Sequence, residues 1–256
     1  MQQDRLQDRI QQATARGQKA LIPYLPAGFP DPERFWQEIL ALDQAGADII
    51  EIGIPFSDPV ADGPVVEEAC QQALAAGISL DWVFQGLEKI KSSLQAEIVL
   101  MGYVNPFLQY GWEHVAARSA ECGVSGIIVP DLPLEESGAV ESLLQAENLT
   151  LIRLIGLNTS LERMRLYAQG SRGFVYFVAV MGTTGSRQEF PPELKVGLSQ
   201  ARQIFSQPLA LGFGLSHPGQ IEPIQDMMDA VVFGSSLIQH LQAGGSSRKF
   251  ISRWRS

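Results

Sequence analysis

Short apolar runs alternate with helix-like segments along the whole chain, and this alternation limits the possible folds more than any other feature of the sequence. Eight apolar runs of strand length occur, and each is followed by a segment with helical periodicity. No repeat of fixed period, low-complexity tract or linker interrupts the series. The pattern predicts an α/β fold with parallel strands, a single (β/α)8 TIM barrel that occupies residues 1–256 as one domain.

The expected elements follow from these runs. The strands are expected at 19–25, 48–54, 97–101, 126–129, 149–155, 173–180, 209–213 and 230–233. The helices are expected at 2–16, from the turn at 30–32 to Ala45, at 65–76 and 82–94, in a segment ending near Cys122, from 135–136 onward, at 160–168, 193–205 and 218–228, and from 234–236 onward. The first helix, within residues 1–17, is additional to the eight units. The connection 181–192 is long for this fold, which predicts a lid loop.

Two acidic residues stand out in the second unit. Glu51 lies within the apolar strand, where an ionised carboxylate is costly unless it is paired, hydrogen-bonded or kept protonated. Asp62 follows eleven positions later, in a loop whose prolines and glycines fix an unusual path. A barrel places both at the carboxyl ends of its strands, where catalytic groups lie. They are therefore candidate catalytic acids, with a structural carboxylate and a turn former as the alternative interpretations.

Two glycine-containing turns follow the seventh and eighth strands. They read Gly212 to Ser216 and Gly234 to Ser236. In barrels of this kind, phosphate is often bound by backbone N–H groups of the loops at these two places. Each turn alone is a weak signal, but the pair predicts a site for a phosphorylated small molecule.

Charge and cysteine content narrow the possible partners and location. The net charge of −9, without a Lys or Arg cluster, argues against nucleic acid and anionic membrane as partners. No signal-peptide core and no run long enough to span a membrane occurs, so we expect a soluble cytoplasmic protein or a shortened organellar form. Cys70 and Cys122 are far apart and lack metal-ligand spacing, which is typical of buried thiols in a reducing compartment.

Several chemistries lack the residues that they need. His114 and His240 lie on expected helices and His217 lies alone in a loop, so no metal site is indicated. No lysine ends a strand, since Lys19 lies at the entrance of the first, and this excludes a Schiff-base route. What remains is general acid–base catalysis by carboxylates on a substrate that carries its own electron sink. Tyrosines near the strand ends would suit a flat ring.

The segment 51–64, EIGIPFSDPVADGP, resembles the signature of the tryptophan synthase alpha chain family. PDLP at 130–133, GFG at 212–214 and LIPYLPAGFPD at 21–31 agree with it, so the likeness covers essentially the whole chain. The resemblance implies retro-aldol cleavage of indole-3-glycerol phosphate to indole and glyceraldehyde 3-phosphate. It implies a carbon–carbon lyase that uses no cofactor and no metal in this chain.

The resemblance also implies roles for individual residues. Glu51 is the acid–base residue that serves indole C3 and the glycerol hydroxyl, and Asp62 holds or deprotonates the indole N–H. The implied substrate-binding residues are Tyr176, Tyr24, Tyr103, Ile128, Leu154, Phe213 and Thr184. The implied phosphate-binding residues are Gly185, Gly214, Gly234 and Ser235.

A pyridoxal-phosphate-dependent beta chain is the partner that the resemblance implies, in an alpha2beta2 heterotetramer contacted through loop 55–61 and Asn105–Pro106. The chain departs from the usual family pattern at 179–185, at 155–158 and at Arg153. These departures concern lid closure and communication with a partner, and they leave the two acidic residues unchanged. Three alternatives remain: a free-standing indole-glycerol-phosphate lyase, a non-catalytic regulatory barrel, and another phosphate-binding barrel isomerase of the same pathway.

Overall fold

The chain folds into a closed barrel of eight parallel strands in sequential order, as the alternation predicts. The computed structural model describes residues 4–179, 190–212 and 214–255. The strands are β1 (Ala20–Pro26), β2 (Ile49–Gly53), β3 (Glu97–Met101), β4 (Val124–Ile128), β5 (Thr150–Gly156), β6 (Val175–Val178), β7 (Leu209–Gly212) and β8 (Ala230–Phe233). β1 pairs with both β2 and β8, which closes the sheet.

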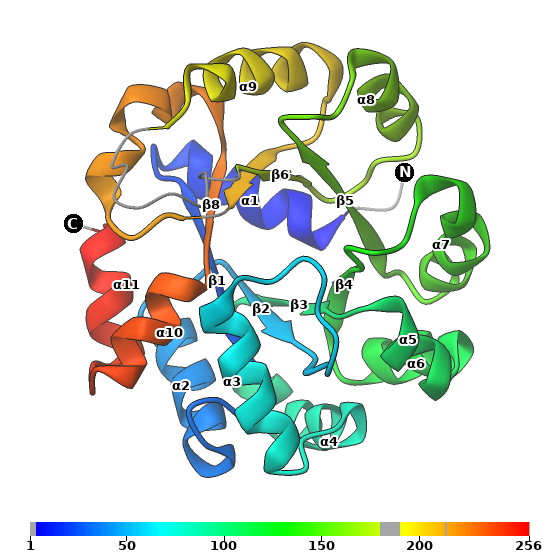
Figure 1. Ribbon diagram of the computed structural model, residues 1–256, viewed down its shortest axis with the longest axis vertical. Coiled ribbons are helices and arrows are strands. Elements are labelled where there is room, and N and C mark those ends of the chain that lie inside the picture. The colour runs from blue at the N-terminus through cyan, green and yellow to red at the C-terminus, as the bar shows by residue number, and fades with distance from the viewer. Residues whose placement is uncertain (1–3, 180–189, 213, 256) are drawn as a thin grey trace.

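Helices surround the barrel (Figure 1). The α-helices are α1 (Arg5–Ala15), α2 (Pro32–Gln44), α3 (Pro64–Ala75), α4 (Leu80–Ile90), α5 (Val104–Tyr110), α6 (Trp112–Glu121), α7 (Ser137–Ala146), α8 (Leu161–Ala168), α9 (Pro192–Ile204), α10 (Ser235–Gln242) and α11 (Ser247–Arg255). Short 3-10 helices are η1 (Lys91–Ser93), η2 (Leu134–Glu136), η3 (Pro218–Gln220) and η4 (Glu222–Met227). No helix in the described part of the chain is both long and apolar enough to cross a membrane.

Two of the predicted helices are wrong in detail. The segment 218–228 forms η3 and η4 instead of one α-helix, because Pro223, inside the expected helix, lacks the N–H group that a continuous α-helix needs there. The helix expected to end near Cys122 is divided into α5 and α6 at Gly111, whose φ of 90° lies outside the helical region. The final helix expected from 234–236 is α10, and α11 follows it as a helix that the sequence pattern did not predict.

α1 closes the amino-terminal end of the barrel, which confirms the prediction of an additional helix before the first strand. The Asp4 carboxylate caps it by accepting hydrogen bonds from the backbone N–H groups of Leu6 and Gln7. A second Asp4 oxygen accepts a hydrogen bond from the Thr150 hydroxyl on β5 at 2.7 Å. The Leu6 side chain lies so close to Gly126 that a Cβ there would come within 2.8 Å of it. With this end filled, the open end of the barrel is the carboxyl end of the strands.

Candidate active site

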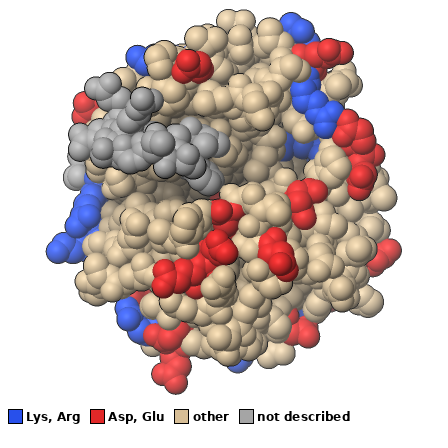
Figure 2. Space-filling view, viewed as in Figure 1, with Lys and Arg blue, Asp and Glu red and all other residues tan. Residues whose placement is uncertain are grey.

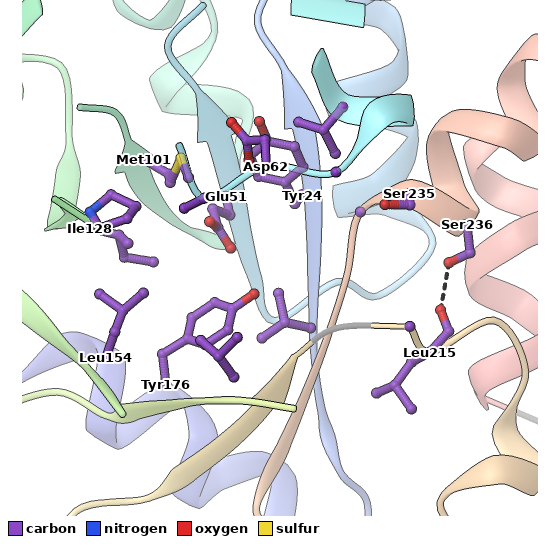
Figure 3. Close-up of a pocket in the computed structure, with 18 of the residues that line it drawn as sticks. Tyr24, Glu51, Asp62, Met101, Ile128, Leu154, Tyr176, Leu215, Ser235 and Ser236 are labelled. Carbon is purple, nitrogen blue, oxygen red and sulfur yellow. Dashed lines mark hydrogen bonds between the residues drawn. The ribbon is translucent and has the colours of Figure 1, made fainter. Parts of the chain in front are cut away.

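A pocket of about 230 Å³ opens at the carboxyl ends of the strands (Figure 3). Strands β1 to β6 and β8 all contribute side chains, and the turns after β7 and β8 complete the wall. The lining residues are Tyr24, Glu51, Ala61, Asp62, Gly63, Val66, Met101, Ile128, Pro130, Leu154, Tyr176, Val178, Gly214, Leu215, Ser216, Val232, Gly234, Ser235, Ser236 and Gln239. No Lys, Arg or His is among these described lining residues. Among these described residues, the groups available to an anion are therefore backbone N–H groups and hydroxyls.

Glu51 projects from the middle of β2 into this pocket. Its side chain is 3% exposed, and one carboxyl oxygen, Oε2, is buried without a hydrogen-bond partner among the described residues. Burial raises the pKa of Glu51 from 4.5 to about 8, and the charge of Asp62 contributes a smaller part of that rise. Glu51 is thus mostly protonated at neutral pH, with an O–H that is available to a molecule in the pocket.

Asp62 lies on the loop after β2 and is held by Tyr103. The Tyr103 hydroxyl donates a hydrogen bond to Asp62 Oδ2 at 2.9 Å and accepts one from the Ala61 N–H at 3.0 Å. Burial raises the pKa of Asp62, the hydrogen bond from Tyr103 opposes this rise, and the charge of Glu67 adds to it. Tyr103 also contacts Phe56, with ring centroids 5.5 Å apart, so both ends of this loop are fixed against the same side chain.

Two tyrosine side chains lie over glycines of the neighbouring strand. A Cβ at Gly53 would overlap the Tyr24 hydroxyl, and a Cβ at Gly212 would overlap the Tyr176 hydroxyl. Burial raises the pKa of both tyrosines well above 10.0, so both hydroxyls remain neutral. In Figure 3 the hydroxyl end of Tyr176 points toward Glu51. The glycines leave the space in which these rings form the apolar floor of the pocket.

The glycine turns after β7 and β8 lie on the side of the pocket away from Ile128 and Leu154 (Figure 3). Gly214 has a φ of 75°, a conformation that favours glycine. Gly234 is forced by close approach, because a Cβ there would come within 2.8 Å of the Tyr24 ring. Ser235 then begins α10, whose first N–H groups have no partner inside the helix. Such a helix start beside a glycine turn can bind a phosphate group.

The structure brings most of the predicted site residues together. Those that line the pocket are Glu51, Asp62, Tyr24, Ile128, Leu154, Tyr176, Gly214, Gly234 and Ser235. Tyr103 is not in the lining set, and lies behind Asp62 as its hydrogen-bond donor. Thr184, Gly185, Phe213 and most of the predicted lid loop 181–192 fall outside the described residues.

Sequence reasoning missed several lining residues. Met101, Val178 and Val232 lie at strand ends, and the two-residue alternation of each strand was the signal that could have found them. Gln239 lies one helical turn beyond Ser235 on α10, so helical spacing was the signal there. For Ser216 and Ser236 no local signal separates a lining hydroxyl from a turn residue.

Metal-binding groups and reactive thiols are not found in the described residues. No cluster of three or more His, Cys, Asp or Glu side chains there could hold a metal ion. Cys70 and Cys122 are buried as free cysteines, as predicted. Burial raises the pKa of the Cys70 thiol to about 12, so it is not a nucleophile at neutral pH.

The charge on this face of the molecule is uneven. Figure 2 shows acidic side chains along one rim of the central hollow, while Lys and Arg lie mainly toward the edge of the view. This distribution agrees with the absence of cationic residues from the described pocket lining. Negatively charged substrates would be bound by local hydrogen-bond donors instead of by a broad positive field.

Comparison with known proteins identifies close relatives over the full length. The sequence pattern of the tryptophan synthase alpha chain family matches residues 10–253. The tryptophan synthase alpha chain of Solidesulfovibrio magneticus is 57% identical over 255 residues, which cover 100% of both chains. The tryptophan synthase alpha chain of Nitratidesulfovibrio vulgaris is 54% identical, with 99% of each chain covered.

Solved structures show the same similarity in three dimensions. The crystal structure of the tryptophan synthase alpha chain from Legionella pneumophila matches with a TM-score of 0.88 at 33% identity, covering 99% of this chain and 97% of that chain. A chain of Mycobacterium tuberculosis tryptophan synthase matches with a TM-score of 0.89 at 30% identity, covering 99% of this chain and 96% of that chain. The similarity therefore extends over the whole barrel and is not confined to the segment that carries the acids.

Proposed function

Because the chain belongs to the tryptophan synthase alpha chain family, we propose that its pocket performs the family reaction with Glu51 and Asp62 as the catalytic residues. The chain is a lyase of tryptophan biosynthesis that cleaves indole-3-glycerol phosphate to indole and glyceraldehyde 3-phosphate. The observation that supports the assignment of roles is the buried Oε2 of Glu51 inside the pocket, which has no hydrogen-bond partner among the described residues. A protonated carboxyl in that place is a proton donor without a structural partner.

The proposed reaction begins at C3 of the indole ring. Protonated Glu51 donates its proton to C3, and the ring nitrogen takes up the resulting positive charge as an iminium. Asp62 accepts a hydrogen bond from the ring N–H and stabilises that charge. Because the iminium is itself an electron sink, the reaction needs neither a lysine Schiff base nor a metal ion.

The second step breaks the carbon–carbon bond. The Glu51 carboxylate removes the proton from the glycerol hydroxyl next to the ring, so a carbonyl forms there as the bond to C3 breaks. The electrons of that bond return to the ring and neutralise the iminium. Indole and glyceraldehyde 3-phosphate result, and Glu51 is protonated again for the next cycle.

The two sides of the pocket differ in chemistry, and we use this difference to place the two ends of the substrate. We place the indole ring against Ile128 and Leu154, between the tyrosine rings, because this wall is apolar. The phosphate is placed at Gly214, Gly234 and Ser235, with Gly185 completing that set. Phe213 and Thr184 complete the substrate-binding set on the ring side. This arrangement is supported by the glycine turns that share the pocket with both acids.

A beta chain is the partner that membership of this family implies. We propose an alpha2beta2 heterotetramer in which the beta chain, not this chain, carries pyridoxal phosphate, and which works in the cytoplasm. Two exposed apolar residues support the predicted contact surface. Val60, on loop 55–61, is 81% exposed, and Leu108, on α5 near Asn105–Pro106, is 60% exposed.

An assay of indole release from indole-3-glycerol phosphate tests the assigned roles. Glu51→Gln and Asp62→Asn are expected to lower the rate by at least about a hundredfold, because each removes a proton-transfer or charge-stabilising group. Glu38→Gln is the matched control, since Glu38 is a buried carboxylate that bonds Ser247 between α2 and α11, away from the pocket. Full activity in Glu51→Gln would contradict the assignment.

Comparison of the rate with and without a beta chain tests the partner. A free-standing lyase would reach its full rate alone, and a non-catalytic barrel would release no indole under either condition. The heterotetramer predicts that Val60→Asp or Leu108→Asp weakens beta-chain binding in sedimentation, while the rate of the isolated chain stays the same. Binding unchanged in both variants would place the interface elsewhere.

A further inference from the structure

The loop 214–217, which follows β7, is held by the side-chain amide of Gln220. Gln220 Oε1 accepts hydrogen bonds from the Ser216 N–H at 2.7 Å, the Ser216 hydroxyl at 3.1 Å and the His217 N–H at 3.0 Å. Its Nε2 donates to the Gly214 carbonyl at 3.4 Å. One neutral side chain, at the end of η3, therefore binds three of the four residues of this loop.

Ser236 holds the same loop from the other side. Its hydroxyl donates to the Leu215 carbonyl at 2.6 Å, which Figure 3 shows as a dashed line. Ser236 belongs to α10, so this bond joins the turn after β7 to the turn after β8. The two glycine turns assigned to phosphate are thus connected by a hydrogen bond that neither turn makes internally.

These bonds fix the orientation of consecutive peptide planes. The plane between Leu215 and Ser216 is held at its carbonyl by Ser236 and at its N–H by Gln220. The preceding peptide plane contains the Gly214 carbonyl and the Leu215 N–H. Gln220 binds the carbonyl and so fixes the orientation of this plane. In a trans peptide the N–H points to the side opposite the carbonyl, so the Leu215 N–H points away from Gln220. Within the described residues no acceptor bonds the Leu215 N–H, and Leu215 itself lines the pocket.

We propose that Gln220 and Ser236 are positioning residues that hold the loop 214–217 preformed for the phosphate group of the substrate; this inference rests on the proposed function. The part of the lining that the structure describes offers phosphate backbone N–H groups and hydroxyls, and such groups bind best when they already point correctly before binding. A loop free to sample other conformations would have to be ordered by the ligand, and affinity would fall. Neither Gln220 nor Ser236 needs to touch the phosphate to have this effect.

Two variants remove the bonds with little change of shape. Ser236→Ala deletes the hydroxyl that bonds Leu215, and Gln220→Met deletes every hydrogen bond of the amide while keeping a side chain of similar length. Ser236→Thr restores a hydroxyl at the same place. Ser142→Ala is the matched control, because the Ser142 hydroxyl also donates to a backbone carbonyl, that of Gly138 on α7, away from the pocket.

The measurement is binding of glycerol 3-phosphate, inorganic phosphate and indole to the purified full chain. Loss of one hydrogen bond predicts about five- to tenfold weaker binding of both phosphate compounds to Ser236→Ala, and a larger loss in Gln220→Met. Indole affinity stays the same in both. With indole-3-glycerol phosphate as substrate, KM rises more than kcat falls, whereas Ser236→Thr and Ser142→Ala behave as the unaltered chain does.

Two results would overturn the proposal, and they differ from failure of the proposed function. Unchanged phosphate affinity in both Ser236→Ala and Gln220→Met would refute the positioning role alone. Equal losses for indole and phosphate would show a general loss of structure and would refute it as well. If the unaltered chain bound no phosphate compound at all, the phosphate assignment itself would fail. Should Gln220→Met not fold, the pair Ser236→Ala and Ser236→Thr decides the question.

Discussion

The Tyr103 hydroxyl donates a hydrogen bond to Oδ2 of Asp62 at 2.9 Å, across 41 positions of sequence. The Tyr103 hydroxyl oxygen also accepts a hydrogen bond from the Ala61 N–H at 3.0 Å, so Tyr103 binds both the carboxylate and the backbone just before it. Tyr103 is 2% exposed and cannot easily give way. The position of the Asp62 carboxylate therefore depends on Tyr103, which lies in the connection after β3, as well as on the loop that carries Asp62.

Tyr103→Phe should weaken catalysis without emptying the pocket. The ring stays, but Asp62 loses a donor that favours its ionised form, so the pKa of Asp62 rises further. We expect the rate of indole release to fall about tenfold, as for the loss of one hydrogen bond to a charged group, and the acid side of the pH–rate profile to move to higher pH.

Tyr110→Phe is the control for this prediction. The Tyr110 hydroxyl donates to Asp81 at 2.6 Å, which makes it a second tyrosine–aspartate pair outside the pocket. It should leave the rate and the pH profile unchanged. A Tyr103→Phe variant with an unaltered profile would show that Asp62 does not depend on the hydroxyl.

Glu51 should make the protein less stable as the pH rises. Its pKa is about 8 when folded and 4.5 when unfolded, so between these values the unfolded chain loses a proton that the folded chain keeps. The stabilising contribution is fully present below pH 4.5 and is lost as the pH rises through 8. Glu51→Gln cannot ionise, so its stability relative to the unaltered chain should increase over this range, by on the order of a few kcal/mol at most.

The free energy of unfolding, measured with urea at about pH 5, 7 and 9, tests this prediction, because these pH values span the interval between the two pKa values. The difference between the two proteins should be small at the lowest pH and largest at the highest. Parallel stability curves would mean that Glu51 is ionised in the folded protein. In that case it could not be the proton donor at neutral pH.

The sequence predicted the barrel well because most strands are apolar runs that are buried along nearly their whole length. The start of one strand was missed because the deciding contact is distant in sequence. β4 begins at Val124, earlier than the expected 126, since the buried hydroxyl of Ser125 is bonded to Glu97 on β3. A serine looks unfavourable for such a strand until its partner is known.

In the candidate site, too, residues that stand out in the local sequence could be predicted, and residues that act through distant contacts could not. Glu51 could be recognised from sequence because a carboxylate in an apolar strand is conspicuous by itself. Tyr103 was expected to contact the indole ring, and nothing local indicates that its hydroxyl is bonded to Asp62. Gln220 was similarly hidden, because an amide that binds a loop looks like any exposed polar residue until the loop is folded around it.

Gly212→Ala should damage the ring pocket through Tyr176. The new Cβ would overlap the Tyr176 hydroxyl, and β7 cannot move away because it is paired with both β6 and β8. The Tyr176 ring must therefore shift into the pocket. We expect KM for indole-3-glycerol phosphate to rise about tenfold, and the free energy of unfolding to fall by about 1–3 kcal/mol, as in other overpacked cores.

Gly138→Ala provides the matched control for that substitution. Gly138 lies on α7, and a Cβ there would meet nothing within 4 Å. Because alanine is a better helix former than glycine, stability should stay the same or rise by up to about 1 kcal/mol, with KM unchanged. Binding of substrate by Gly212→Ala as tight as before would show that Tyr176 does not define the pocket.

The last prediction compares two ion pairs of opposite burial. Arg153 on β5 donates to Glu141 on α7 at 2.6 Å and to the Ser137 hydroxyl at 3.0 Å, and its side chain is 7% exposed. Arg163 on α8 makes two hydrogen bonds to Glu135, so this pair has better hydrogen-bond geometry than Arg153–Glu141. The side chains of Arg163 and Glu135 are, however, 31% and 63% exposed. Geometry alone would rank the second pair as the more stabilising.

Burial should reverse that ranking. Glu141→Leu leaves the guanidinium of Arg153 uncompensated, with an Nε that already lacks a partner among the described residues, so we expect a loss of up to about 3 kcal/mol in the free energy of unfolding. Glu135→Leu frees Arg163 into water, where its charge is solvated, so its effect should be small and should shrink further in high salt. Urea unfolding of both variants at low and high salt measures the difference. Equal losses from the two substitutions would mean that the charge of Arg153 is solvated in the folded protein.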